Sequence, residues 1–131
     1  MKSNDLVKTY FQALERGDFA SLSEIFHHDI VWHQPGHSDL SAVYKGIDAV
    51  FKLFAAFMER SQGTFKIDQV EAIMTNGPLV SAIVSFSARR GLESIAMKGV
   101  DLMRIIDGKI VEVHLFSADS QSEDAFWSIN N

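Results

Sequence analysis

The spacing of apolar residues changes near the middle of the chain, and this change constrains the fold more than any other feature. Up to Gly63, apolar residues recur at the 3.6-residue period of helices that bury one face. From Thr64 onward, strand-like apolar segments alternate with turns. Helices followed by an antiparallel meander predict an α+β fold, and 131 residues suit a single domain over 1–131.

Three helices are expected in the first half, over residues 3–16, 19–27 and 46–60. Gly17 stands where a left-handed C-cap is needed, and Asp18 can cap the second helix. The other expected segments are a strand over 30–33, a loop over 34–45, strands over 64–74, 79–88, 94–106 and 110–117, and a short helix or loop over 119–127.

Composition excludes several classes of function. The formal net charge of −5 argues against nucleic acid and against an anionic membrane surface as partners. The absence of cysteine excludes disulfides and thiolate metal sites. Residues 1–5 lack the apolar core of a signal peptide, and no apolar run is long enough to span a bilayer, so we expect a cytoplasmic protein.

Residues 32–37, with the sequence Trp-His-Gln-Pro-Gly-His, form the most distinctive local cluster. An indole, two imidazoles and an amide are unusual contents for a core strand, because buried polar groups need partners. The cluster therefore predicts one wall of a small-molecule pocket.

The pair Asp107-Gly108 predicts a two-residue hairpin turn. With such a turn, Ile106 pairs with Lys109, and Asp101 then lies opposite His114 on one face of the sheet. A bulge in the turn would shift this register by one residue and separate the pair. The same face is expected to carry Met103, Glu112 and Phe116.

Asp101 and His114 are predicted to stand together in a cavity, where the carboxylate orients the imidazole or, when protonated, donates a hydrogen bond itself. The alternative is a structural pair at a sheet edge or a dimer surface. His33 and His37 could join His114 as metal ligands, but their spacing matches no zinc motif, so we expect no metal and no cofactor.

Tyr10 lies on the apolar stripe of the first helix, where it is either a core residue or, aimed into a cavity, an oxyanion stabiliser. The other large aromatic side chains equally fit a core or a pocket lining. The residues expected to contact a small apolar ligand are Trp32, Gln34, Tyr44, Phe54, Phe57, Met103 and Phe116.

Several segments are similar to one group of proteins. Tyr10–Phe19 resembles the first helix and turn of the nuclear-transport-factor-two-like, or ketosteroid isomerase-like, superfamily. Residues 32–36 and 44–46 resemble its SnoaL-like, or polyketide cyclase-like, branch, as do residues 101–104 and 107–110 near the end. The resemblance covers nearly the whole chain.

This resemblance implies a cone-shaped, curved antiparallel sheet wrapped by three N-terminal helices around a cavity. Family members often dimerise through the outer face of the sheet, which implies a homodimer. The superfamily hosts isomerases, cyclases, hydratases, hydrolases and binding proteins, so the fold alone implies no single reaction.

Ketosteroid isomerase, a relative within the superfamily, allows a comparison residue by residue. Its oxyanion-stabilising tyrosine matches Tyr10, and its protonated aspartic acid matches Asp101. Its general base falls on Gln34, whose amide cannot take a proton at neutral pH, so His33 or His114 would have to serve.

We therefore expect a pocket protein that acts as an acid/base isomerase or cyclase next to a carbonyl of an apolar substrate. The expected catalytic residues are Tyr10, Asp101, His114 and His33. One alternative, favoured by Gln34, is a non-catalytic ligand-binding or dimerisation module. A protein-interaction role is compatible with the acidic charge, but no residue favours it.

Overall fold

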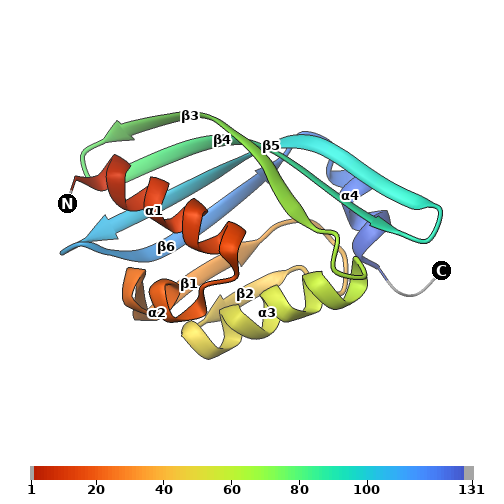
Figure 1. Cartoon of the computed structure of the whole chain (residues 1–131), viewed down its shortest axis with the longest axis horizontal. Coiled ribbons are helices and arrows are strands. Elements are labelled where there is room, and N and C mark those ends of the chain that lie inside the picture. The colour runs from red at the N-terminus through yellow and green to blue at the C-terminus, as the bar shows by residue number, and fades with distance from the viewer. Residues whose placement is uncertain (1, 129–131) are drawn as a thin grey trace.

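The computed structural model describes residues 2–128 and has four helices and one curved, unclosed six-stranded sheet (Figure 1), which confirms the α+β prediction. No helix within those residues is long and apolar enough to cross a membrane. The elements in chain order are α1 (Ser3–Arg16), α2 (Phe19–Ile25), β1 (Phe26–Gln34), β2 (Ala42–Lys45), α3 (Ile47–Arg60), β3 (Lys66–Asn76), β4 (Leu79–Arg90), β5 (Glu93–Ile106), β6 (Lys109–Ser117) and α4 (Ser120–Trp127).

Local capping signals position the first two helices. Gly17 ends α1 with a φ of 64°, in the left-handed region that glycine adopts without strain. The side chain of Asp18 caps α2 by accepting a hydrogen bond of 3.1 Å from the backbone N–H of Ser21. The helix ends earlier than expected because Phe26 already pairs with Ile110 of β6.

The strand order is β2-β1-β6-β5-β4-β3, and every neighbouring pair is antiparallel except β1 and β6, which are parallel. Strand β2 lies inside the segment 34–45 that was expected to be a loop, so that expectation is wrong over its last four residues. Strand β2 is defined by its pairing with β1, and its four residues show no apolar period that would predict a strand. In Figure 1, α1 and α3 lie along one side of the sheet, and α4 lies at the end opposite the N-terminus.

The predicted turn between β5 and β6 is present. Asp107 and Gly108 have φ angles of 50° and 74°, as a two-residue hairpin turn with two left-handed residues requires. Ile106 pairs with Lys109, as expected from this turn. The hairpin therefore starts in the predicted register.

The register then shifts by one residue, because β6 contains a bulge at Val111. Arg104 pairs with Glu112 beyond the bulge, so Asp101 lies opposite Leu115. The predicted pairing of Asp101 with His114 is wrong, since one extra residue on one strand reverses which side chains share a face.

Asp101 therefore shares a face with Leu115 and Trp32, which we call the inner face because the helices cover it. The opposite, outer face carries Glu112 and His114. Met103 shares the inner face with Asp101, as predicted. Glu112, His114 and Phe116 were predicted to share that face, but they lie on the outer one.

Gly99 of β5 allows a close approach on the inner face. A Cβ atom at this position would lie 2.7 Å from the carbonyl oxygen of Phe116 and 3.2 Å from a ring carbon of Phe86. The first contact is with backbone, which cannot move without disturbing the β5–β6 pairing.

We expect Gly99→Ala to lower the free energy of unfolding by about 1–3 kcal/mol, because the added methyl group overpacks the sheet. Urea denaturation followed by circular dichroism measures the change. Ser94→Ala, at an exposed position of the same strand, is the matched control and should change stability little. Equal stability of the Gly99→Ala variant and the parent would contradict this account of the packing.

Candidate functional site

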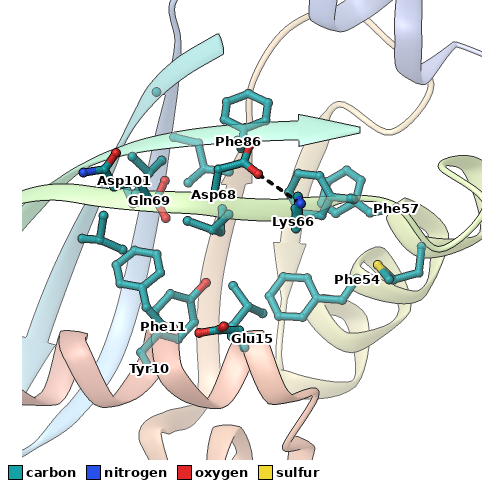
Figure 2. Close-up of a pocket in the computed structure, with 18 of the residues that line it drawn as sticks. Tyr10, Phe11, Glu15, Phe54, Phe57, Lys66, Asp68, Gln69, Phe86 and Asp101 are labelled. Carbon is teal, nitrogen blue, oxygen red and sulfur yellow. Dashed lines mark ion pairs between the residues drawn. The ribbon is translucent and has the colours of Figure 1, made fainter. Parts of the chain in front are cut away.

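A cavity of about 720 Å³ lies between the inner face of the sheet and the helices (Figure 2). Tyr10 and Phe11 enter it from α1, and Phe54 and Phe57 enter it from α3. Asp101 reaches it from β5, in the middle of the sheet. The cavity is large enough for a drug-sized molecule.

Aromatic rings form most of the apolar wall. Trp32 packs edge-on against Phe54, with ring centroids 5.1 Å apart, and Phe57 packs against Trp127 of α4 at 4.7 Å. These rings support one another in fixed orientations. The wall therefore suits a flat, apolar ligand, and the sequence-based placement of Trp32, Phe54 and Phe57 in the lining agrees with the structure.

Asp101 is the most perturbed acid of this cavity. Burial, and to a lesser extent the neighbouring carboxylate of Glu123, raise its pKa from 3.8 to about 7. Asp101 stays partly accessible because its side chain lines the cavity, although protein atoms surround it. Near neutral pH this carboxyl group is thus able both to accept and to donate a proton.

Tyr10 lines the same cavity and is 1% exposed. Burial raises the pKa of its phenol well above the usual value of 10.0, and the negative charge of Asp101 adds to this effect. The phenol therefore stays protonated throughout the physiological range and is available as a hydrogen-bond donor.

Glu123 of α4 is a cavity residue that sequence reasoning missed. Its Oε2 accepts a hydrogen bond of 3.1 Å from the indole N–H of Trp127, and burial raises the pKa of its carboxyl group. The two residues are four positions apart, which places them on one side of a helix. That spacing is a usable sequence signal only once the segment is known to be helical.

The resemblance to ketosteroid isomerase implies that Gln34 stands at the position of that enzyme's general base. The side chain of Gln34 is 7% exposed and its Oε1 accepts a hydrogen bond of 3.1 Å from the indole N–H of Trp32. The amide is therefore already partnered inside the wall, and it serves to orient Trp32.

Charged residues from both β3 and α1 border the cavity. Lys66 and Asp68 of β3 form an ion pair of 3.6 Å, and Glu15 and Arg16 of α1 also border the space (Figure 2). These groups are solvated, so the polar rim and the apolar interior are separated.

Four predicted site residues lie elsewhere. His33 and His114 do not border the cavity, because strand alternation and the β6 bulge place them on the outer face. Met103 is fully buried in the core, and the hydroxyl of Tyr44 donates to the carbonyl oxygen of Leu40 at 2.7 Å. Neither of these two is part of the cavity lining.

Phe116 borders the cavity only in part. It follows the inward-facing Leu115, so its side chain points to the outer face, and the residue is 56% exposed. Phe116 thus borders the cavity, as expected for a ligand contact, from a side chain that is mostly exposed.

Comparison with known proteins identifies the family. The model of the SnoaL-like domain matches residues 7–113, which is most of the chain. The chain belongs to the SnoaL-like domain family. This SnoaL-like protein is 42% identical to a protein of unknown function with a cystatin-like fold from Xanthomonas campestris, with a TM-score of 0.93 and coverage of 98% of this chain and 99% of the other.

Two further relatives are informative about the SnoaL-like fold. An uncharacterised protein of Mycobacterium tuberculosis is 27% identical over 124 residues, which cover 95% of each chain. IdmH, a candidate polyketide cyclase from Streptomyces antibioticus, is 19% identical with a TM-score of 0.76, covering 90% of this chain and 93% of IdmH. At this identity the likeness to IdmH establishes the shared fold.

We expect an NMR titration of the side-chain carboxyl of Asp101 to have its midpoint at about 7. Glu123→Gln removes a nearby negative charge and should lower the pKa of Asp101, while burial keeps it above 3.8. Glu24→Gln, at an exposed position of α2, is the matched control and should leave the midpoint unchanged. A wild-type midpoint close to 3.8 would contradict the described burial of Asp101.

Proposed function

We propose that the cavity binds a small, largely apolar molecule with a carbonyl group and that the protein removes a proton next to that carbonyl, as an isomerase or cyclase. One observation carries the proposal: an acid with a pKa of about 7, Asp101, stands in an aromatic-lined cavity. General-base catalysis is most efficient when the pKa of the base lies near the working pH.

In this proposal Asp101 and Tyr10 divide the chemistry between them. The ionised carboxylate of Asp101 takes the proton from the carbon next to the carbonyl, and the C–H electron pair forms the enolate. The phenol of Tyr10 donates a hydrogen bond to the enolate oxygen. Return of the proton from Asp101 to another carbon of the conjugated enolate completes an isomerisation. Alternatively, the enolate carbon attacks a second carbonyl of the same molecule and closes a ring, and the alkoxide formed from that carbonyl takes the proton back from Asp101.

The surroundings support this division of roles. Tyr10 remains protonated because its pKa is raised, so its O–H is available to donate to the enolate oxygen. Asp101 titrates near neutrality, so a useful fraction is ionised. The aromatic wall excludes water from the reacting carbon and orients a flat molecule.

Binding without turnover is the second candidate function. It is favoured by the lining itself, since no histidine among the described residues borders the cavity. Gln34 also supplies an amide where a related enzyme keeps its base. Asp101 would then hold a ligand carbonyl or hydroxyl by a hydrogen bond.

Hydrogen exchange in D₂O tests the proposed reaction without knowledge of the product. Apolar ketones that raise the Tm of the protein are incubated with it, and NMR follows deuterium entering the position next to the carbonyl. We expect the wild-type rate to rise with pH through about 7, because Asp101 is the active base only when ionised.

Asp101→Asn should slow this exchange by about 10²–10⁴-fold and Tyr10→Phe by about 10²–10³-fold, with ketone binding retained in both. Asp107→Asn, in the exposed turn, is the matched control and should exchange at the wild-type rate. Exchange that survives Asp101→Asn unchanged would overturn the assignment of the base. Ketone binding with no exchange by the wild-type protein would establish the second candidate function instead.

We also propose that the chain forms a homodimer through the outer face of its sheet. Large apolar residues are exposed on this face, among them Phe116 at 56%, Met74 at 53% and Val43 at 53%. These residues are spread across the face from β2 to β3, and exposed apolar groups on one sheet face are typical of association surfaces.

Sedimentation equilibrium should therefore give twice the mass of one chain. Phe116→Glu should shift the protein toward monomer, because it places a charge in the proposed interface. Leu92→Glu is the matched control, since Leu92 is fully exposed in the β4–β5 turn, and it should remain dimeric. A wild-type protein that stays monomeric at all concentrations tested would contradict the proposal.

A further inference from the structure

A cluster of two imidazoles and one carboxylate lies on the outer face, away from the cavity. The Nε2 of His33 is 3.0 Å from Oε2 of Glu112, and the Nε2 of His114 is 3.3 Å from the same oxygen. The ligand atoms of all three residues lie within 4.8 Å of one another. The side chains of His33, Glu112 and His114 are 32%, 30% and 43% exposed, so solvent reaches the cluster.

The sheet itself builds this cluster. His33 of β1 and His114 of β6 are partners in the parallel pairing, and their rings are stacked at 3.9 Å with an interplanar angle of 7°. Glu112 is two residues before His114, so it points to the same face one pleat away. All three side chains therefore start from paired strands and not from loops.

We propose that His33, Glu112 and His114 form a binding site for a divalent transition metal ion such as Zn²⁺. Two ligands about 2.0–2.1 Å from a tetrahedral zinc ion are about 3.3 Å apart. The distances of 3.0 and 3.3 Å between the carboxylate oxygen and the two imidazole nitrogens match such an edge. Because the two rings are stacked with an interplanar angle of 7°, their Nε2 lone pairs are nearly parallel, so at least one ring must rotate about its side-chain bonds for both nitrogens to face the ion.

The donor set defines the class of ion. Two imidazoles with one carboxylate suit zinc, cobalt, nickel and copper, and they do not suit calcium or magnesium, which prefer oxygen ligands. Arg104 lies 3.5 Å from the other carboxylate oxygen of Glu112, Oε1. The guanidinium contacts Oε1 and so orients the carboxylate with Oε2 toward the imidazoles. In metal sites, groups that contact the ligands and not the ion orient the ligands in this way.

A second group of potential ligands, His27, His28 and Asp29, differs in construction. Its members are consecutive in sequence, and the Nδ1 of His27 already accepts a hydrogen bond from the backbone N–H of Asp29 at 3.0 Å. The side chains of His28 and Asp29 are 78% and 79% exposed. The group lies in β1 between Phe26 and Val31, where the pairing with β6 is irregular, so it serves as an internal control that offers imidazoles and a carboxylate from one strand alone.

Metal binding is measured on the untagged full chain after treatment with a chelator. Equilibrium dialysis against Zn²⁺ gives the stoichiometry per chain, and Co²⁺ gives visible absorption bands that report the coordination. We expect one ion per chain, with the imidazole NMR signals of His33 and His114 shifted by Zn²⁺ and those of His27 and His28 unchanged.

His114→Ala and Glu112→Gln should each weaken Zn²⁺ binding about tenfold or more, whereas His28→Ala should leave it unchanged. Circular dichroism checks that each variant is folded, and His33→Ala provides a further test should one variant fail to fold. Absence of saturable binding by the wild-type chain would overturn the proposal. An equal loss in the His28→Ala variant would also overturn it, because the ion would then be bound elsewhere.

Discussion

The bulge at Val111 of β6 is the constraint on which the arrangement of both candidate sites depends. It adds one residue between the hairpin turn and the centre of the sheet, so the phase of β6 relative to β5 is reversed beyond Arg104. Asp101 then faces inward beside Leu115, while Glu112 and His114 face outward. Without the bulge, a carboxylate and an imidazole would share the cavity.

The inward position of Asp101 has an electrostatic consequence. A buried carboxylate beside another acid is destabilised in its ionised form, which is why the pKa of Asp101 rises to about 7. The fold tolerates this because Asp101 can hold its proton and because the cavity gives it partial contact with solvent. The same conditions that make this acid unfavourable for stability make it suitable for proton transfer near neutral pH.

The two faces of the sheet therefore have different chemistry. The inner face combines aromatic rings with a few buried acids and one phenol, which suits an apolar ligand with a single polar group. The outer face brings imidazoles from β1 and β6 together around Glu112, and it also exposes Phe116. The proposed metal site lies within the proposed association surface, because His33 pairs with Val43 and His114 is two residues before Phe116 on the same face, and neither involves the cavity.

The sequence by itself determined the local elements and the family. Helix periodicity, the caps at Gly17 and Asp18 and the Asp107-Gly108 turn follow from residue types and short spacings, whereas the place of Tyr10 and Asp101 in the lining was implied by the family resemblance. The bulge at Val111, the parallel contact between His33 and His114 and the approach of Glu123 to Asp101 were decided only by the tertiary structure. The reason is physical: each depends on how strands and helices distant in sequence pack together, and no local pattern of apolar residues records a shift of one residue between two paired strands.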